Sequence, residues 1–457
     1  MKVMEPNSPG QIGGITPPKK YLLYRGLRFK DFLALLIVAG YLFAPLGIFL
    51  RGAVILVPLT VLLFFSTFTI GMGRKVPWLR FLRENHIHFN LYAIFLLFVG
   101  VNLILHRGIQ FDLKSGFNFF LGYAQVFFAI FATAYLGSRE KPVVLKARNI
   151  VLFLIIIQCV WSLYHIFKDP IIIRSMMRES YTQDFGYGLG DVRLFIAYAI
   201  VLPLIIKMAI IEKSRLAIIA TICILGLSLL SNFGATMVIA VFGVLFTVLA
   251  MIINLNKLRS FKKVALAIIT IVVVISGTLV VYYSRENIIS GQYNKFILLF
   301  RNYKSGGYTE YYAVQGSRYL LIERSLTTFI ANPWFGVGPQ QIRGSDYSML
   351  SGEHCSLADH LAKYGLLAGG GVYIIFMILF FGGNMYKWLD KRFERQFQAA
   401  AISCFFLIGI GGPFWENPAA WITLLLFSSE DGKRPIGLIK KRIRKNLQKR
   451  QIQITNE

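Results

Sequence analysis

Long apolar blocks alternate with short polar segments along almost the whole chain. Each block has roughly twenty residues and almost no charge, which is the length that an α-helix needs to cross a bilayer. The pattern predicts an all-α polytopic membrane protein with about twelve transmembrane helices. The predicted spans are residues 32–50, 53–73, 89–105, 117–136, 149–167, 192–211, 216–231, 234–253, 264–283, 361–383, 399–411 and 419–428.

The polar segments divide the chain into five parts. Residues 1–31 form a basic tail, residues 32–283 hold spans one to nine, and residues 284–360 form one long loop. Residues 361–428 hold spans ten to twelve, and residues 429–457 form a second basic tail. The long loop has the densest polar and aromatic content of the chain, and we expect it to carry short helices.

Composition excludes a soluble fold. Hydrophobic residues make up 56% of the chain and charged residues 16%, against about 45–50% and about 25% in soluble domains. Four scattered cysteines give no disulfide framework.

The net charge of +27 is explained by the positions of the basic residues. If the N-terminus is inside, most Lys and Arg fall in inner segments, as the positive-inside rule requires. We therefore expect both termini in the cytoplasm, the long loop outside, and no nucleic acid as a partner.

Residues 316–339, the arginine segment, predict a helix in the long loop. Ser317 is a suitable N-cap, and Pro333 ends the helix because the residue before a proline avoids helical angles. Arg318 flanks the apolar stripe of this helix. The stripe comprises Tyr319, Ile322, Leu326, Phe329 and Ile330.

Residues 351–371, the histidine segment, run directly into the tenth span. A helix here places His354 on one face with Gly365, about 10 Å above the hydrocarbon edge. Asp359 and Lys363 are four residues apart, which predicts a supporting pair on the helix surface.

Several chemistries compete at the histidine segment. A lone loop histidine can be purely structural. Cys355 adjoins His354, but neighbouring helical residues point about 100° apart, which disfavours a Cys–His nucleophile. His354 and His360 have no third ligand in register for zinc. The chain also has no Asp-x-Asp pair, so arginines would have to hold any phosphate group.

The two segments resemble the O-antigen ligase and polymerase superfamily, which are bacterial membrane glycosyltransferases. The resemblance lies in GSR followed by ANPWFGVG, in EHCSLADHLAKYGLL, and in the twelve-span topology with its long outer loop. The ligases carry His, then Asn, Ser or Gln, nine residues and Gly. Here His354 is followed by Cys355, nine residues and Gly365.

The resemblance implies glycosyl transfer from undecaprenyl-pyrophosphate-linked oligosaccharides on the outer face of the cytoplasmic membrane. It implies His354 as the catalytic base, with Glu353 in reserve, and Arg318 on the pyrophosphate. Arg193 and Arg301 are further candidates for the pyrophosphate, although Arg193 at a helix end can equally be a snorkelling side chain. No metal or cofactor is expected, and a chain-length regulator and a flippase are candidate partners.

Three functions remain open at this point. EHCSLADHLAKYGLL and NPAAWITLLLF favour a polymerase of oligosaccharide repeat units. An O-antigen ligase fits the spacing after His354 but not Cys355, and a Ser-Arg pair expected between spans seven and eight is missing. Twelve spans also suit a polysaccharide transporter or flippase, although no acidic residue falls inside a predicted span.

Overall fold

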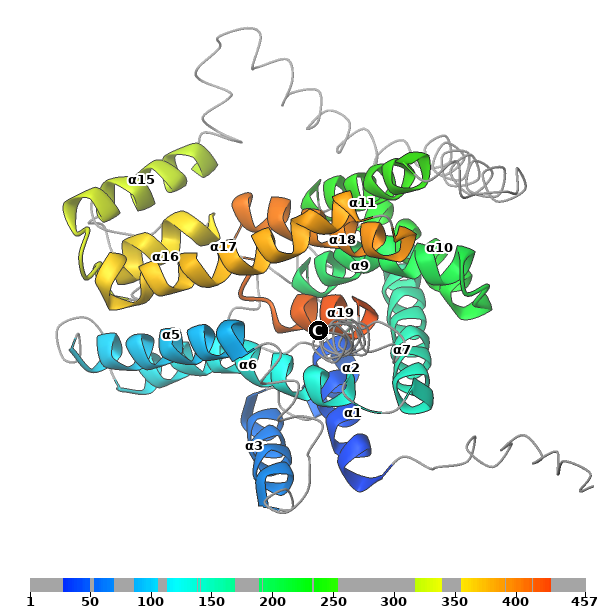
Figure 1. Ribbon diagram of the computed structural model, residues 1–457, viewed down its shortest axis with the longest axis horizontal. Helices are drawn as coiled ribbons and strands as arrows, with labels where there is room; N and C mark the ends of the chain where they lie inside the picture. The colour runs from blue at the N-terminus through cyan, green and yellow to red at the C-terminus, as the bar shows by residue number, and fades with distance from the viewer. Residues whose placement is uncertain are drawn as a thin grey trace, which may run out of the picture.

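The computed structural model is all-helical throughout the residues that it describes (Figure 1). The described residues are 28–49, 53–69, 86–105, 113–137, 139, 141–168, 189–190, 192–231, 234–253, 317–338, 355–390, 392–412 and 414–428. No β-strand occurs among them. The prediction of an all-α protein is therefore confirmed for this part of the chain.

Helices cover all or part of each predicted apolar block except 264–283, which lies outside the described residues, and two further helices begin in the predicted long loop. In chain order they are α1 (Phe29–Leu42), α2 (Ala44–Phe49), α3 (Ala53–Thr69), α5 (His86–Leu105), α6 (Leu113–Gly137), α7 (Lys141–Lys168), α9 (Val192–Ile210), α10 (Arg215–Leu230), α11 (Gly234–Ile253), α15 (Ser317–Ala331), α16 (Ser356–Tyr364), α17 (Gly371–Met385), α18 (Phe393–Ile410) and α19 (Pro418–Ser428).

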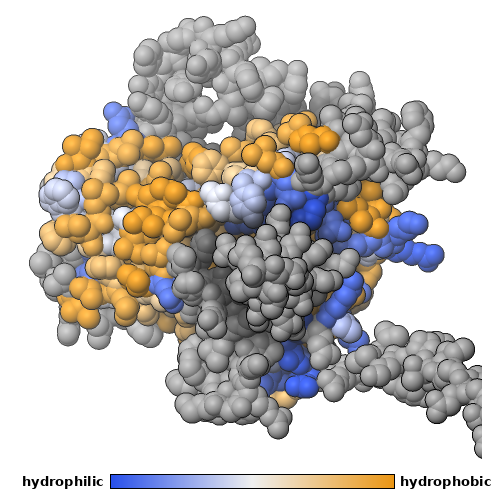
Figure 2. All heavy atoms as spheres, viewed as in Figure 1, coloured by the Kyte–Doolittle hydropathy of each residue, from blue (hydrophilic) through white to orange (hydrophobic). Residues whose placement is uncertain are grey.

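Four segments are long and apolar enough to cross a membrane. They are Phe120–Gly137, Lys141–Lys168, Val192–Ile210 and Leu366–Leu389. Shorter apolar helices accompany them, among them Arg215–Leu230 and Pro418–Ser428. Apolar side chains also cover much of the surface in the region of α5 and α15 to α17 (Figure 2).

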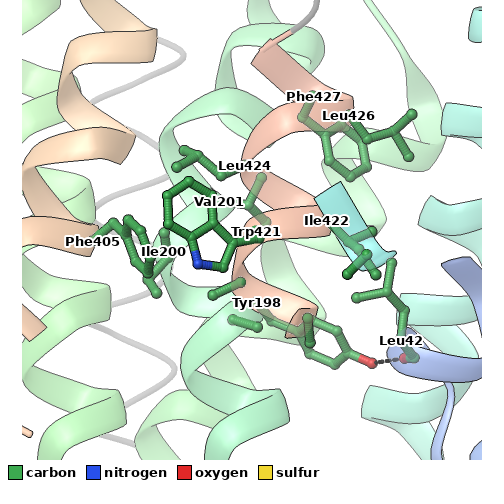
Figure 3. Packing of buried hydrophobic residues seen from close by; sticks show 14 of the residues in the cluster. Leu42, Tyr198, Ile200, Val201, Phe405, Trp421, Ile422, Leu424, Leu426 and Phe427 are labelled. Atoms are coloured by element: carbon green, nitrogen blue, oxygen red, sulfur yellow. Dashed lines mark hydrogen bonds between the residues drawn. The ribbon is translucent and has the colours of Figure 1, made fainter. Parts of the chain in front are cut away.

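Helix α9 is the centre of the bundle. Every side chain from Leu194 to Ile205 is buried, and α9 packs against α10, α11, α18 and α19. Small residues allow this close packing. Gly243 of α11, for example, comes so near that a Cβ there would lie 3.5 Å from the Ala199 carbonyl oxygen. Trp421 of α19 fills the space beside Ile200 and Phe405 (Figure 3).

The first predicted span is broken at Phe43, between α1 and α2. Pro45 explains the break, because a proline ring clashes with the carbonyl four residues earlier. Neighbouring helices satisfy the backbone groups that the break leaves: Ala44 N donates to Gln158 Oε1 at 3.0 Å, and the Tyr198 hydroxyl donates to the Leu42 carbonyl (Figure 3). Buried backbone groups need such partners.

The tenth predicted span, 361–383, is also not one continuous helix. Helix α16 ends at Tyr364, a wide turn covers Leu366–Gly370, and α17 then begins at Gly371. Gly365 (φ 56°) and Gly369 (φ 123°) adopt left-handed conformations at this kink, which glycine tolerates best. The membrane-crossing segment therefore starts at Leu366, and α16 lies before it.

Candidate functional site

The predicted site residues fall into two groups. His354, Glu353 and Arg301 lie outside the described residues. Arg318 lies in the first turn of α15, and the structure describes its backbone only. Arg193 lies in the first turn of α9 with an exposed side chain. The site therefore has to be built from the elements that carry these residues.

The arginine segment and the histidine segment are joined by their backbones. The turn that follows α15 crosses the end of α16, and four backbone hydrogen bonds of 2.8–3.0 Å connect them. The bonds are Val337 N to Ala362 O, Gly338 N to Lys363 O, Leu366 N to Pro333 O, and Leu367 N to Trp334 O. The described parts of the arginine and histidine segments thus form one structural unit.

Two glycines make this crossing possible. Gly336 and Gly365 both have positive φ, at 69° and 56°. A Cβ on Gly336 would lie 2.4 Å from the Lys363 carbonyl, and one on Gly365 would lie 2.5 Å from the Trp334 carbonyl. No larger residue fits either position without moving the backbone. Gly336 and Gly365 therefore allow the two segments to cross closely.

Helices α15 and α16 run side by side in the same direction (Figure 1). Ser325 in the middle of α15 meets Asp359 near the start of α16, and the C-terminal ends of both helices meet at the crossing. Arg318 precedes Ser325 by about 10 Å along the helix axis. Arg318 therefore lies toward the end of the pair at which the chain passes from His354 into α16.

Asp359 fixes the start of α16. Its carboxylate accepts a 2.6 Å hydrogen bond from Ser325 Oγ and a 3.1 Å bond from the backbone N of Cys355. Burial raises the pKa of Asp359, while the Ser325 hydrogen bond and the Lys363 charge oppose the shift. Both Asp359 (2% exposed) and Lys363 (5% exposed) are buried. The predicted surface pair was wrong, because α15 covers this side of α16.

The turn between α18 and α19, which we call the α18–α19 turn (residues 411–412 and 414–417), meets the start of three helices. Ser356 Oγ of α16 donates to the Gly412 carbonyl at 3.0 Å. Asn417 Nδ2 donates to the Arg193 carbonyl at 2.7 Å, and Asn417 Oδ1 caps α19 by accepting from Ala419 N. Through this turn the start of α9, which bears Arg193, is connected to Ser356, two residues after His354 in the chain.

The α18–α19 turn also carries Glu416, which the sequence analysis did not single out. Its Oε1 lies 3.3 Å from Nε2 of His360, a fully buried residue of α16. His360 Nδ1 is 2.5 Å from the Ser356 carbonyl oxygen, and its ring stacks on Tyr373 at 3.7 Å. Burial lowers the pKa of His360 to about 3. The two residues are far apart in the sequence, and no local spacing indicates their contact.

His360 has an aromatic enclosure drawn from several helices. Phe95 of α5, Tyr123 of α6 and Tyr364 of α16 surround the ring with centroid distances of 5.6–6.0 Å. Tyr373 of α17 closes the remaining face. The His360 ring is thus enclosed on several sides, with its Nε2 3.3 Å from Glu416 Oε1 in the α18–α19 turn.

Comparison with known proteins adds no assignment: no protein-family model matches the chain, and no curated protein is significantly similar to it. Within the described ranges, no group of three or more His, Cys, Asp or Glu side chains is placed to hold a metal ion. The described site consists of the linked α15–α16 pair, the exposed Arg193 and the Glu416–His360 contact.

Proposed function

We propose that this protein polymerises undecaprenyl-pyrophosphate-linked oligosaccharide repeat units into a surface polysaccharide. In this proposal the chain crosses the bacterial cytoplasmic membrane about twelve times and works on its outer face. The observation that carries it is the backbone crossing of the arginine and histidine segments. The crossing gives a physical reason for two separate motifs of the resemblance to occur in one loop.

The reaction needs a base and fixed positive charge. A hydroxyl oxygen of the acceptor sugar attacks the anomeric carbon of the growing chain, and the bond from that carbon to the lipid pyrophosphate breaks. The hydroxyl proton passes to His354, for which Glu353 is the alternative. Arg318 stabilises the charge that develops on the pyrophosphate, since a planar guanidinium can contact two phosphate oxygens.

Arg193 is the second cation that the proposal uses. Its side chain is exposed at the start of α9, and its carbonyl is bonded to Asn417 in the α18–α19 turn. The α18–α19 turn also contacts Ser356, close to His354 in the chain. Connection to this turn favours a role on the substrate over simple snorkelling. Arg301 remains a weaker candidate that rests on sequence alone.

A ligase is the second candidate function. The nine-residue spacing between Cys355 and Gly365 fits the ligase pattern. Gly365 lies at the backbone crossing, where no larger residue fits, so a glycine is needed at this position of the chain. Cys355 itself departs from that pattern. Its backbone N is bonded to Asp359, so Cys355 caps α16 through its backbone and needs no particular side chain for that role.

Two variants test the proposal in a host strain that lacks the chromosomal copy. His354→Gln is expected to insert normally and to lower polymer formation about 10²–10⁴-fold, which is the usual effect of losing a positioned base. Arg318→Lys is expected to lose most polymer, because lysine has no planar fork. Arg324→Lys on the same helix is the matched control and is expected to keep activity.

The lipid-linked products distinguish the two candidate functions. A polymerase that has lost His354 leaves single repeat units on the lipid carrier, whereas an inactive ligase leaves long polymer there. Near-normal polymer in a well-expressed His354→Gln strain would contradict both.

The orientation has its own test. A reporter fused within 284–360 is expected to respond from the outer face of the cytoplasmic membrane, and reporters at Lys75 and at the C-terminus from the cytoplasm. A cytoplasmic signal from the long loop would overturn the orientation and the placement of the site.

A further inference from the structure

Helix α15 has an exposed stripe whose character changes along its length. Glu323, Leu326, Ile330 and Trp334 follow one another at helical spacing, and all four are exposed. Thr327 is exposed beside them, and its hydroxyl donates to the Glu323 carbonyl at 2.9 Å. The stripe is therefore polar at Glu323 and becomes apolar toward the turn that follows the helix.

The other side of α15 is packed against the protein. Ser325 and Thr328 are buried, and Ser325 Oγ donates to Asp359 of α16. The apolar end of the stripe therefore points away from the bundle. Ile330 is 74% exposed, and Phe335 in the turn is 60% exposed.

The turn after α15 lies level with the ends of two apolar helical segments. Leu366 N donates to the Pro333 carbonyl at 2.8 Å, and Leu366 is the first residue of a segment that is long and apolar enough to cross a membrane. Asn102 Nδ2, in the last turn of α5, donates to the Phe335 carbonyl at 3.3 Å. The turn is thus fixed at the place where one of these segments begins and the other ends.

The exposed apolar surface continues from the turn onto both neighbours. Leu366 and Leu367 are exposed beside it. From Leu91 to Ile104 every exposed residue of α5 is apolar. Apolar side chains accordingly cover the region of α5, α15 and α16 in Figure 2. The exposed residues of this continuous surface are Ile94, Leu97, Val101, Ile104, Leu326, Ile330, Trp334, Phe335, Leu366 and Leu367.

We infer that the end of α15 contacts the acyl chains of the bilayer. The residues that make this contact, which we call the α15 lipid surface, are Leu326, Ile330, Trp334 and Phe335. The inference goes beyond the proposed function, because it assigns a membrane contact to a helix outside the spans that the apolar pattern predicts. Glu323 marks the limit of the contact, since an ionised side chain is costly among acyl chains.

Two arguments favour lipid as the occupant. Apolar surface left in water costs about 25 cal/mol per Å², and tryptophan is enriched where acyl chains meet the head groups. A surface that binds a second copy of the chain usually has a polar rim around its apolar centre. The α15 lipid surface instead runs without a polar border onto α5 and onto the start of a membrane-crossing segment.

Cysteine labelling in proteoliposomes tests the contact. Ile330→Cys and Phe335→Cys place a thiol on the α15 lipid surface, and Glu323→Cys is the matched control on the same stripe. A charged, water-soluble maleimide is supplied on both sides of the bilayer. Because the thiolate reacts and apolar surroundings disfavour it, the two test variants are expected to react at least about tenfold more slowly than Glu323→Cys.

The unmodified protein gives the background rate, since three of its four cysteines are buried. Each rate is divided by that of the same variant unfolded in SDS, which removes differences in intrinsic reactivity. Equal rates at positions 323 and 330 in the bilayer, whether both fast or both slow, would overturn the inference.

A photoactivatable lipid distinguishes acyl chains from a second copy of the chain. The unmodified protein is reconstituted with a phospholipid that bears a diazirine close to the carbonyl end of one acyl chain. Irradiation is expected to attach lipid to the peptide that holds Ile330, Trp334 and Phe335, as it does to the exposed side of α5. Lipid on α5 alone would contradict the contact, and cross-links between two copies through this peptide would identify the second copy as the occupant instead.

Neither measurement depends on enzymatic activity. Should His354→Gln and Arg318→Lys prove fully active, the proposed function fails, while the labelling still decides whether the end of α15 contacts lipid. Should the labelling fail, the tests of His354 and Arg318 keep their meaning.

Discussion

Two acidic side chains, Asp31 and Glu416, lie beside different parts of α6 and are held in different ways. Asp31 accepts hydrogen bonds from Arg28 N, the Tyr135 hydroxyl and Arg139 Nη2, and its Oδ1 lies 2.7 Å from Arg139 Nε. Glu416 faces a neutral imidazole and keeps a quarter of its surface exposed. The α6 tyrosines that mark the two places, Tyr135 and Tyr123, are about 18 Å apart along the helix.

The two contacts have different roles: the Asp31 contact holds helices together, and the Glu416 contact belongs to the candidate site. Asp31 and Arg139 form an ion pair between the start of α1 and the link from α6 to α7. Glu416 instead lies 3.3 Å from the Nε2 of a buried histidine, and a quarter of its side chain is exposed. The Asp31–Arg139 pair fixes helices in place, whereas the Glu416 side chain is partly open to solvent.

The largest effect is expected at the anchor. Asp31→Ala leaves Arg139 without its partner in a mostly buried place, which costs about 3–5 kcal/mol of unfolding free energy. Polymer formed per folded molecule is expected to remain unchanged. Unfolding in detergent, followed with temperature, measures the cost.

Replacing both residues, Asp31→Ala with Arg139→Ala, is expected to cost less than the sum of the single variants. If the costs are additive, the two side chains do not interact, and the interpretation of Asp31 and Arg139 as an anchor is wrong.

The crossing of the two motifs is expected to give the next largest effect. Gly365→Ala forces a Cβ to within 2.5 Å of the Trp334 backbone at φ 56°, which costs about 2–4 kcal/mol. Activity is expected to be lost as well, since α15 and α16 separate.

Gly382→Ala is the matched control for the crossing. Gly382 lies in α17, and a Cβ there meets no atom within 4 Å, so alanine is expected to raise stability slightly. Equal stabilities of the Gly365 and Gly382 variants would refute the crossing.

The Asp359 contacts give the smallest effects. Asp359→Ala removes the acceptor of Ser325 Oγ and Cys355 N and is expected to cost about 2 kcal/mol, while Ser325→Ala removes one bond and costs about 1 kcal/mol. Both costs come from unfolding curves. Because Asp359 fixes the start of α16, its alanine variant is also expected to lower polymer formation. Full activity at reduced stability would make Asp359 a structural residue only.

The apolar pattern predicted most of the described helices, whereas the contacts around the candidate site come from tertiary packing. Apolar blocks specify helices locally, as α7, α9 and α11 show. The kink at Gly365 was missed because the apolar run from 361 to 383 continues through it, and only contact with Trp334 reveals the crossing. Asp359 was expected at the surface because i,i+4 spacing describes a single helix and cannot show that α15 covers this side of α16. The contact between His360 and Glu416 joins distant segments and follows from tertiary packing alone.

Reconstitution of the purified protein in liposomes tests the central claim most directly. The protein is incubated with lipid-linked repeat units, and the products are separated by length. Polymerisation predicts a ladder of lengthening saccharides, with one lipid pyrophosphate released for each unit added, from the unmodified protein and not from His354→Gln. Repeat units that keep their original length, with no lipid pyrophosphate released, would contradict the account.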